Sequence, residues 1–562
     1  MKYKIFALIL LLAINLDFSI AKEQIVFSAI KKELQRSMTE LQQENAPPLY
    51  YVSYSVVERK NSTVSAAFGK IKSAKAEQSR ALDIDLRVGD HKFDNTHIIR
   101  GDQFQFSGFK SSFDLPIEDD EKSIRNAVWF ITDKAYKNAI ERYEKAYSNR
   151  AVKVQEEDTS ADFSKEVPAR FSNEIKEFDI DTAAWKAKAR LASSFFANED
   201  WLYDGSVIIS GTTTIKYFIN SDGSEIKQFE PSFRIIISAF TKAEDGMTLP
   251  LTNSYFAFSP NELPSDEQLE KDVKKMISLL KELREAELMK TFSGPAILSG
   301  EASGVFFHEI FGHRVEGHRQ KDPSSSQTFK NFIGKKVLPE YIDVVFDPTI
   351  NNLKGFPLSG HYVYDDEGVR GQKVVTVENG IFKNFIMSRS AIENFPNSNG
   401  HGRKNVGYDA VSRQSNLIVI PKETLPASSL KDRLREECKK QDKEYGLYFE
   451  KVQGGFTFTG TTVPNAFNVT PILVYKIYAD GRKDEMVRGV DLIGTPLTTF
   501  ANIVAAGDDL GVFNGMCGAE SGYIPVSACS PSLLVSLIEV QRKAKSQAKP
   551  PILEAPSVLK SN

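Results

Sequence analysis

Apolar and polar residues alternate along much of this chain in the manner of β-strands, and helical spacing is confined to a few segments. Residues 49–58 are dense in aromatic and β-branched side chains, and Leu82, Ile84 and Leu86 alternate with polar residues. Residues 29–43 have an amphipathic helical pattern, which a pair of prolines ends. These patterns predict an N-terminal part in which helices accompany a sheet.

A second run of predicted strands, residues 202–258, contains a hairpin and leads to a long helix. Asp222 and Gly223 lie between two strand-like runs, which is a hairpin signal. Ser265, followed three residues later by Gln268, has the shape of a capping box. Apolar residues at helical spacing then predict a helix that continues to a histidine-rich stretch; they are Leu269, Val273, Met276, Leu280 and Leu283.

The remaining pattern completes the predicted fold class, which is α+β. Residues 123–152 are helical in pattern, and the charged residues 155–176 are typical of an exposed, partly irregular connection. Beyond the long helix the pattern is mostly that of antiparallel strands, with helical exceptions at 430–445 and 497–506. We therefore expect an N-terminal α/β domain with a mixed sheet, a long linking helix that carries on to the histidine motif, and a C-terminal, mainly antiparallel β domain. The predicted segments are a signal peptide (1–21), the N-terminal domain (22–263), the linking helix (264–290), the C-terminal domain (291–546) and a disordered tail (547–562).

The first residues have the pattern of a secretion signal. Lys2 and Lys4 precede an apolar run over residues 5–16 that is too short for an ordinary transmembrane helix, and a small-x-small cleavage site ends at Ala21. We expect an exported chain that begins near Lys22 and has no stable membrane span; an uncleaved anchor is the alternative. Periplasm and extracellular space both remain open, because both use this type of signal.

Composition narrows the function classes. The 71 Lys and Arg residues nearly balance the 74 Asp and Glu residues in a chain of 562, which gives no reason to expect binding to nucleic acid or to an acidic membrane. The three cysteines, Cys438, Cys517 and Cys529, are too few for a disulfide scaffold. An odd number in an exported protein leaves at least one thiol unpaired, bridged to another chain, or bound as a ligand.

Residues 304–318 hold three of the seven histidines and an adjacent His308-Glu309 pair on an apolar background. Two imidazoles and a carboxylate are the minimum for a hydrolytic zinc site, in which the imidazoles bind the metal and the carboxylate takes a proton from metal-bound water. Neighbouring histidine and glutamate residues are often plain surface residues, but this arrangement is rare by chance when histidines are so few.

The spacing of the two histidines is unusual. The common pattern H-E-x-x-H places both on one helix face. Here His313 follows His308 by five residues, which separates them by about 140° on a regular α-helix. A π-bulge would bring them to one side, and Gly312 could ease that distortion. We therefore predict a locally irregular helix, since a regular one would argue against shared metal binding.

A catalytic zinc site normally has three protein ligands and one open position. Chemistry alone leaves the third ligand open among Glu316, His318, His361, His401 and the cysteines. Cys517 stands out because glycines flank it closely, which lets the backbone approach a site, and because a thiolate is a strong zinc ligand. Its alternative role is that of a small buried hydrophobic residue.

Several motifs, taken together and in order, resemble the TldD/PmbA metallopeptidases, on the TldD side. The metal-binding segment comes first, and the motifs lie at residues 294–298, 303–317, 364–368, 399–404, 492–494 and 516–518. A hairpin at residues 220–223 is similar to one in the N-terminal half of that family. The resemblance is specific from about residue 265 to residue 543 and loose before that.

The resemblance implies that His308, His313 and Cys517 bind zinc and that Glu309 is the catalytic base. It also implies a peptidase that acts on unfolded or flexible peptides, and a homodimer or a heterodimer with a related subunit that encloses the active sites. Two features depart from the family. His318 stands where an acidic residue is expected, and the signal peptide and the long insert around residues 123–176 are not features of the cytosolic members, which leaves substrate and partner open.

Other polar residues are candidates for supporting the ligands or contacting substrate, among them Glu316 and His318. Asp365 and Asp366 could orient ligands or form an exposed hairpin turn, and both readings stay open. His401 with Arg403 and Lys404 could bind a substrate carboxylate terminus, although solvated loop charges are the commoner explanation.

Rival functions follow from the same residues. An intact H-E-x-x-x-H motif with a cysteine argues against a catalytically silent binding subunit. A structural zinc site would be favoured by a fourth ligand from Glu316 or His318, because such sites are usually closed. A helix that binds no metal would be an ordinary core helix. A thiolate ligand weakens the Lewis acidity of zinc, so we expect modest turnover from an active enzyme.

Overall fold

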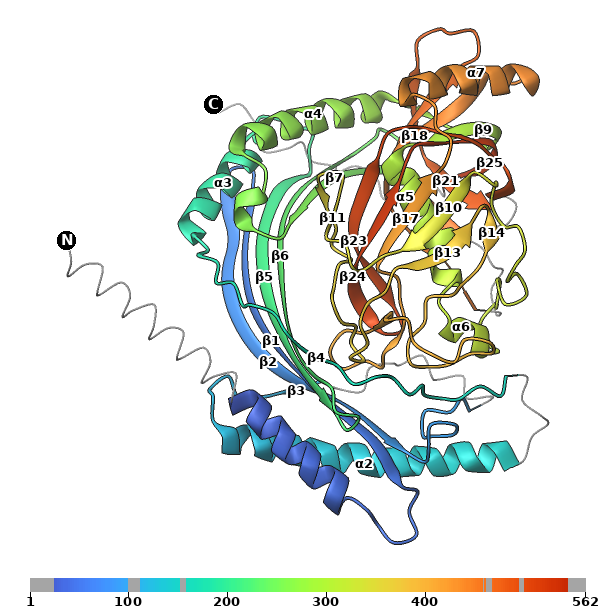
Figure 1. Cartoon of the computed structure of the whole chain (residues 1–562). Coiled ribbons are helices and arrows are strands. Elements are labelled where there is room, and N and C mark those ends of the chain that lie inside the picture. Colours follow the sequence, from blue (N-terminus) through green and yellow to red (C-terminus); the bar gives the residue numbers. More distant parts are fainter. Residues whose placement is uncertain are drawn as a thin grey trace, which may run out of the picture.

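The computed structural model describes residues 25–99, 112–151, 158–457, 459–460, 467–494 and 500–543. Its mixture of helices and strands confirms the predicted α+β class (Figure 1). The predicted signal peptide and disordered tail lie outside the described residues. Among the helices that are described, none is long and apolar enough to cross a membrane.

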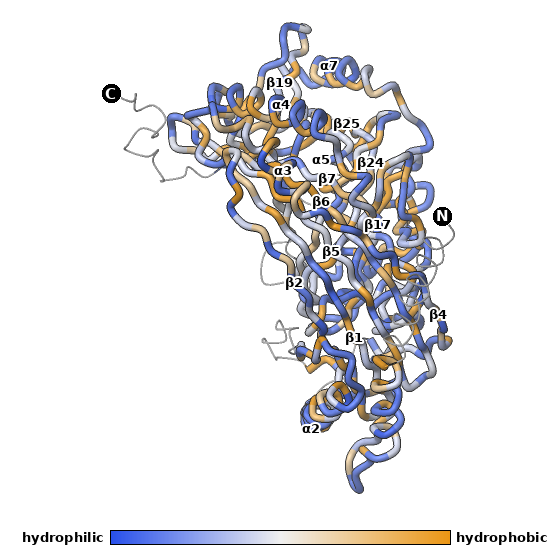
Figure 2. Tube along the Cα trace, turned by 90° about the vertical axis from the view of Figure 1, so that its left-hand side faces the viewer, coloured by the Kyte–Doolittle hydropathy of each residue, from blue (hydrophilic) through white to orange (hydrophobic). Residues whose placement is uncertain are grey.

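A seven-stranded sheet of long strands forms the N-terminal half and curves around the C-terminal half (Figure 1). Its order is β3-β2-β1-β5-β6-β4, with β7 also paired to β6, and every pairing is antiparallel except that of β4 with β6. Buried and partly exposed residues alternate from Phe233 to Lys242, and hydrophilic and hydrophobic stretches are mixed along the strands of the sheet (Figure 2). The strands are β1 (Leu49–Ala67), β2 (Lys70–Val88), β3 (Phe113–Asp114), β4 (Arg170–Ser172), β5 (Asp204–Asn220), β6 (Glu225–Lys242) and β7 (Thr248–Ala257).

Helices cover one face of this sheet at both of its ends. Helices α3 (Thr182–Ser194) and α4 (Asp266–Glu285) bury their apolar side chains against one end. The predicted helix around residues 123–152 is α2 (Glu121–Ala151), which packs with a helix over residues 25–40 against the other end. The side chain of Ser265 caps α4, as the sequence predicts. The opposite face of the sheet, on which the alternate side chains lie, is the concave face toward the C-terminal half (Figure 1).

The C-terminal half consists of two sheets with helix α5 (Gly300–Ile310) between them, where it contacts strands of both. The six-stranded sheet has the order β14-β13-β10-β17-β24-β23, and the eight-stranded sheet β18-β9-β25-β21-β19-β20-β8, with β22 paired to β25. Most pairings are antiparallel; β17 with β24, β18 with β9 and β20 with β8 are parallel. The bounds are β8 (Glu287–Leu288), β9 (Phe292–Leu298), β10 (Ile342–Phe346), β13 (Val374–Glu378), β14 (Ile381–Phe382), β17 (Asn416–Pro421), β18 (Tyr445–Thr457), β19 (Phe467–Tyr478), β20 (Glu485–Arg488), β21 (Val490–Gly494), β22 (Ile503–Ala506), β23 (Gly511–Ala519), β24 (Gly522–Ser530) and β25 (Leu533–Arg542).

The short elements refine two predictions. The helix expected at 430–445 is α7 (Leu430–Lys440), and the residues after it turn into β18. The helix expected at 497–506 is helical at residues 500 and 501 but wrong over its last residues, because β22 occupies residues 503–506 and pairs with β25. The other short elements are β11 (Asn352–Leu353), β12 (Phe356–Pro357), β15 (Gly402–Arg403), β16 (Val411–Ser412), η1 (Pro260–Glu262), η2 (Gly312–Arg314), η3 (Ala427–Ser429) and α6 (His318–Lys321).

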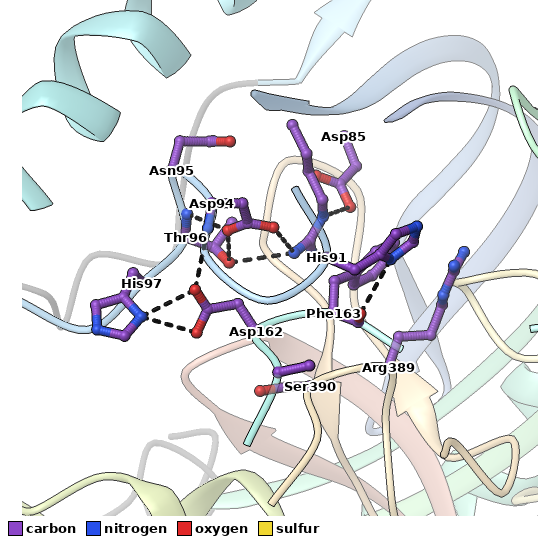
Figure 3. A network of polar contacts seen from close by, with 12 residues as sticks. Asp85, His91, Asp94, Asn95, Thr96, His97, Asp162, Phe163, Arg389 and Ser390 are labelled. Atoms are coloured by element: carbon purple, nitrogen blue, oxygen red, sulfur yellow. Dashed lines mark hydrogen bonds and ion pairs between the residues drawn. The ribbon is translucent and has the colours of Figure 1, made fainter. Parts of the chain in front are cut away.

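Within the connection predicted to be exposed, residues 155–176, the described residues before β4 are irregular, and Asp162, Phe163 and Ser164 are buried. Figure 3 shows the polar contacts of this segment. The Asp162 carboxylate lies 2.9 Å from Nδ1 of His97, in the N-terminal half. It also lies 3.3 Å from Nζ of Lys321, which follows the histidine motif. Asp162 therefore links this segment to both halves of the chain. The charged composition of the segment predicts exposure and does not reveal that Asp162 is buried.

Phe163, in the same segment, is expected to stabilise the fold through two arginines. The guanidinium carbons of Arg87 and Arg389 lie 3.6 Å and 3.8 Å from the centroid of its ring. Phe163→Leu should therefore lower the free energy of unfolding by about 2 kcal/mol, with about 1 kcal/mol from each cation–π contact. The matched control is Phe113→Leu, because one lysine lies 5.7 Å from the ring centroid there. Equal losses in denaturant titrations of the two variants would contradict this.

Candidate metal centre

Helix α5 and the turn after it position the two histidines of the motif. The Ser299 hydroxyl accepts the N–H of Ala302 and caps the helix, which ends at Ile310. His308 lies in the last helical turn and His313 in the following 3₁₀ turn η2. Their ring centroids are 4.9 Å apart, with the planes at 78°. The two imidazoles are thus neighbours despite their five-residue spacing.

The predicted irregularity is present, but it is not a π-bulge. The helix ends, and the N–H of Arg314 donates to the carbonyl of Phe311, three residues back, which tightens the backbone. Gly312 does not serve as a flexible residue here. A Cβ at this position would collide with the amide group of Gln414, so the glycine admits a side chain from elsewhere in the chain.

Cys517, on strand β23, completes a set of three potential ligands. Its Sγ lies 3.4 Å from Nε2 of His313, and the ligand atoms of His308, His313 and Cys517 all lie within 4.8 Å of one another. Two ligand atoms of one tetrahedral zinc are about 3.5 Å apart, given bonds of about 2.0 Å to nitrogen and 2.3 Å to sulfur. Nδ1 of His308 is buried and without a hydrogen-bond partner among the described residues. The residues therefore fit zinc.

The charges of these groups favour a thiolate. Burial by itself raises the pKa of the Cys517 thiol, but the neighbouring His313 and His308 outweigh it and hold the pKa well below its usual range. Burial lowers the pKa of His313, whereas Cys517 and Glu316 raise it, to about 10. A sulfur that readily loses its proton beside two imidazoles is a soft anionic ligand of the kind zinc binds.

Glu316 supports His313 from the side away from the sulfur. Its Oε1 lies 3.2 Å from Nδ1 of His313, and its Oε2 accepts a hydrogen bond of 2.7 Å from Nε of Arg319. The Arg413 guanidinium lies 3.7 Å away. Burial raises the pKa of Glu316, but Arg319 and His313 outweigh it and bring the pKa to about 2. A carboxylate at Nδ1 fixes the ring orientation of a metal-binding histidine.

His318 belongs to a neighbouring group and not to the three-ligand set. Its Nε2 lies 2.5 Å from the carboxylate of Glu520. Glu316, His318 and Glu520 are themselves close enough to hold a cation. However, Arg319 donates to both glutamates, so a protein cation already occupies the place between them. Among the described residues, Glu316 and His318 are thus engaged by protein groups.

Glu309 is adjacent to His308 in α5 and is 6% exposed. Its backbone carbonyl accepts a 2.7 Å hydrogen bond from Nη1 of Arg314, which closes the turn that carries the motif. Glu309 is therefore a buried residue that directly follows a potential ligand in the helix, and its negative charge acts on Arg314, whose pKa it raises against the effect of burial.

Asp365 and Asp366 lie elsewhere, and the expectation of an exposed turn is wrong for them. Asp365 is buried and accepts the N–H groups of Val369 and Gly402 at 2.8 Å and 2.9 Å. Asp366 lies 3.0 Å from Nζ of Lys216, on the N-terminal sheet. Their hydrogen bonds hold a loop and join the two halves, so the structure gives them no contact that orients a metal ligand.

His401 and Arg403 are buried as well, which corrects the expectation of solvated loop charges. Nδ1 of His401 lies 3.0 Å from Oδ1 of Asn399, and its Nε2 lies 3.1 Å from the hydroxyl of Ser415. The guanidinium of Arg403 donates to the backbone carbonyls of Gln414 and Pro525. The His401 imidazole and Nη1 of Arg403 are thus used within the protein and not in a solvated loop.

Burial of His401 predicts a loss of stability in acid. Burial lowers the pKa of His401 from 6.5 to about 3. Below pH 6.5 the unfolded chain therefore binds a proton that the folded chain does not, and stability falls as the pH falls toward 3. This group alone should cost about 1.4 kcal/mol per pH unit in that window. Denaturant titrations of His401→Gln should show a slope smaller by about this amount, and equal slopes would contradict the assignment.

Two residues that the sequence did not indicate hold the backbone of the potential ligands in place. Nη2 of Arg413 donates to the carbonyl of Cys517 at 2.8 Å, and Nε2 of Gln414 donates to the carbonyl of His308 at 3.2 Å. Both belong to a run of five polar residues, 412–416, with no exposed surface. A run of polar residues is typical of a surface loop, so its composition carries no signal of this role.

Comparison with known proteins agrees with this geometry. Residues 291–542 match the model of the PmbA/TldA metallopeptidase C-terminal domain. Both potential metal-binding histidines and Cys517 lie within the matched residues.

Several proteins of similar sequence are named for peptidase activity. A metalloprotease of Archaeoglobus fulgidus is 33% identical over 42% of this chain and 51% of its own. A metalloprotease TldD homolog of Buchnera aphidicola is 30% identical over 56% of this chain and 63% of its own. A zinc metalloprotease TldD homolog of Saccharolobus solfataricus is 24% identical over 44% of this chain and 51% of its own. The chain thus spans about half to two thirds of the length of these relatives.

The fold extends the likeness to the N-terminal half. The solved structure of TldE from Thermococcus kodakarensis has a TM-score of 0.58 with this chain, covers 91% of it and all of its own length, and is 13% identical. The curved sheet is therefore part of a shared architecture, and at this identity the likeness concerns the fold alone.

Proposed function

We propose that this chain is a zinc-dependent peptidase that hydrolyses bonds in unfolded or flexible peptides. The observation that carries the proposal is the convergence of His308, His313 and Cys517 beside the buried Glu309. Three protein ligands leave a fourth position for a reacting group, which is the arrangement of catalytic zinc sites. The names of the relatives support the same class of reaction.

The chemistry divides between the metal and the chain. Zinc, when bound, supplies a Lewis acid that polarises a peptide carbonyl and makes water acidic near neutral pH. A carboxylate oxygen of Glu309 accepts the proton that the attacking water loses, and then gives it to the nitrogen of the leaving amine. The negative sulfur of Cys517 reduces the acidity of the metal, so turnover is modest.

Burial of the site favours unfolded substrates. The exposed fractions of His308, Glu309, His313 and Cys517 are 6%, 6%, 7% and 6%. A single extended chain reaches groups with so little exposed surface more easily than the surface of a folded protein does. This argument supports the substrate class independently of the relatives.

The test uses one polypeptide in two states. A small disulfide-containing protein is presented to the zinc-loaded chain with its disulfides intact, and again after reduction and alkylation have unfolded it. The proposal predicts cleavage of the unfolded form and little of the folded form, with loss of activity when a chelator removes the metal. Equal cleavage of both forms would overturn the substrate class, and cleavage of neither would overturn the peptidase.

A further inference from the structure

The concave face of the N-terminal sheet carries a patch of small polar side chains, the polar tract. The register places Asn61, Thr212 and Ser232 side by side across β1, β5 and β6, and Thr63, Ser210 and Arg234 in the next row. All six are partly exposed. The alternate residues of these strands, such as Val64, Ile209 and Phe233, are buried against α3 and α4 on the other face.

Arg234 is the cation of this tract, and its contacts are to neutral groups. Its Nη1 donates to the carbonyl of Asn514 at 2.8 Å and to the hydroxyl of Ser254 at 3.2 Å. Its guanidinium carbon lies 5.3 Å from the ring centroid of Phe256, the cross-strand neighbour. Within the described part of the chain, no carboxylate forms an ion pair with it.

This lack of a carboxylate partner distinguishes Arg234 from two other arginines of the chain. The buried Arg87 and the partly buried Arg319 each pair with two carboxylates. Burial lowers the pKa of Arg234, with no acidic neighbour to oppose the effect. The guanidinium nevertheless stays charged at neutral pH, so it remains available for an anion.

The position of Arg234 relates it to the metal centre. Asn514 precedes Cys517 by three residues on β23, and β23 is the edge strand of its sheet. At about 3.4 Å per residue, the two backbone positions are about 10 Å apart. An extended peptide whose bond lies at the metal would therefore bring a group about three residues away to the neighbourhood of Arg234.

We propose that Arg234 binds a carboxylate of the peptide substrate, and so is a specificity-determining residue. The carboxylate is either the C-terminus of the peptide or an acidic side chain about three residues from the cleaved bond. A guanidinium binds a carboxylate through paired, charge-assisted hydrogen bonds, and the hydroxyls of the tract offer no competing charge. The inference rests on the proposed peptidase function, but binding tests it without cleavage.

The experiment measures binding to the zinc-loaded Glu309→Gln chain, in which turnover is blocked. The probes are a short unstructured peptide, the same peptide with an amidated C-terminus, and both versions with one internal glutamate replaced by glutamine. We expect Kd to be about tenfold lower for the version that keeps the recognised carboxylate. The amidated and glutamine arms distinguish the C-terminus from the side chain.

The quantity to compare is the ratio of Kd for the peptide without the recognised carboxylate to Kd for the peptide that keeps it. Arg234→Gln, made in the Glu309→Gln chain, should bring this ratio to about one, while the Kd of the uncharged peptide changes little. Arg234→Lys should restore part of the ratio, which a purely structural tie to Asn514 would not require. Arg59→Gln is the matched control and should keep the ratio, because Arg59 lies on the same face but donates to Asn405. The proposal would be overturned if the ratio of Kd values is near one while Arg234 is present, or if it stays near ten after Arg234→Gln. It would also be overturned if none of the peptides binds measurably. The peptidase function itself is tested separately, by measuring peptide cleavage with the unsubstituted, zinc-loaded chain.

Discussion

Glu309→Gln is expected to reduce peptide cleavage by about a thousandfold while zinc remains bound. General acid–base catalysis contributes about 10²- to 10⁴-fold, and glutamine has nearly the same shape but cannot accept the proton. The change leaves His308, His313 and Cys517 in place, and these residues form the potential ligand set. A loss of rate without a loss of metal is therefore the result that separates a base from a ligand.

The measurement is the initial rate of cleavage of an unstructured peptide, together with the zinc content of the same sample. Glu301→Gln is the matched control, because Glu301 is a glutamate of the same helix α5 but lies near Lys451, at 3.9 Å, and not beside a ligand. Its rate should stay within a few-fold of the unsubstituted chain. Undiminished cleavage by Glu309→Gln would show that another group is the base.

Glu316→Gln is expected to weaken both the fold and zinc binding. The substitution removes a buried negative charge that faces His313 and Arg319, with Arg413 also close. Removal of one member of a buried charge pair costs about 3–5 kcal/mol, because the other charge stays buried. Loss of the carboxylate that orients a metal-binding histidine typically lowers metal affinity by about 10- to 100-fold.

Glu520→Gln separates the two effects of this substitution. Glu520 also pairs with Arg319 and with His318, but among the described residues it forms no ion pair with His313. It should therefore destabilise the fold while changing zinc affinity little. Unfolding titrations and competitive zinc titrations of both variants give the comparison. If the two variants lose zinc affinity equally, Glu316 does not position His313.

The metal motif was predictable in kind but not in detail. The local pattern around His308 and His313 carries the chemistry and demands an irregular helix. The form of that irregularity, a 3₁₀ turn, depends on packing with Gln414, which is distant in sequence and collides with any Cβ at Gly312. The third ligand was left open by chemistry alone for the same reason. Cys517 reaches the site only because β23 pairs at the edge of a sheet.

The long strands were predicted in pieces. The aromatic run at 49–58 and the alternation near residue 84 were readily identified, yet β1 and β2 continue through the polar residues between them. Residues 70–80 of β2 are mostly exposed, so they need no apolar alternation. Backbone pairing with β1 holds them as a strand, and the turn at Phe68 and Gly69, both with positive φ, closes the hairpin.

Buried polar residues were the least predictable part. Asp365, His401 and Arg403 look like surface groups in sequence, and each is buried with partners from distant segments. Residues 412–416 show the same effect over five consecutive positions. Hydropathy reports the cost of burying such side chains, whereas the compensating hydrogen bonds come from tertiary contacts that no local pattern contains.

The most direct test of the metal centre is a crystal structure of the zinc-loaded chain with anomalous diffraction data at the zinc absorption edge. The account predicts one anomalous peak within bonding distance of His308, His313 and Cys517, with no fourth protein ligand. A peak closed by Glu316 or His318 would indicate a structural zinc and contradict the proposed enzyme. A peak away from these three residues would contradict the metal centre itself.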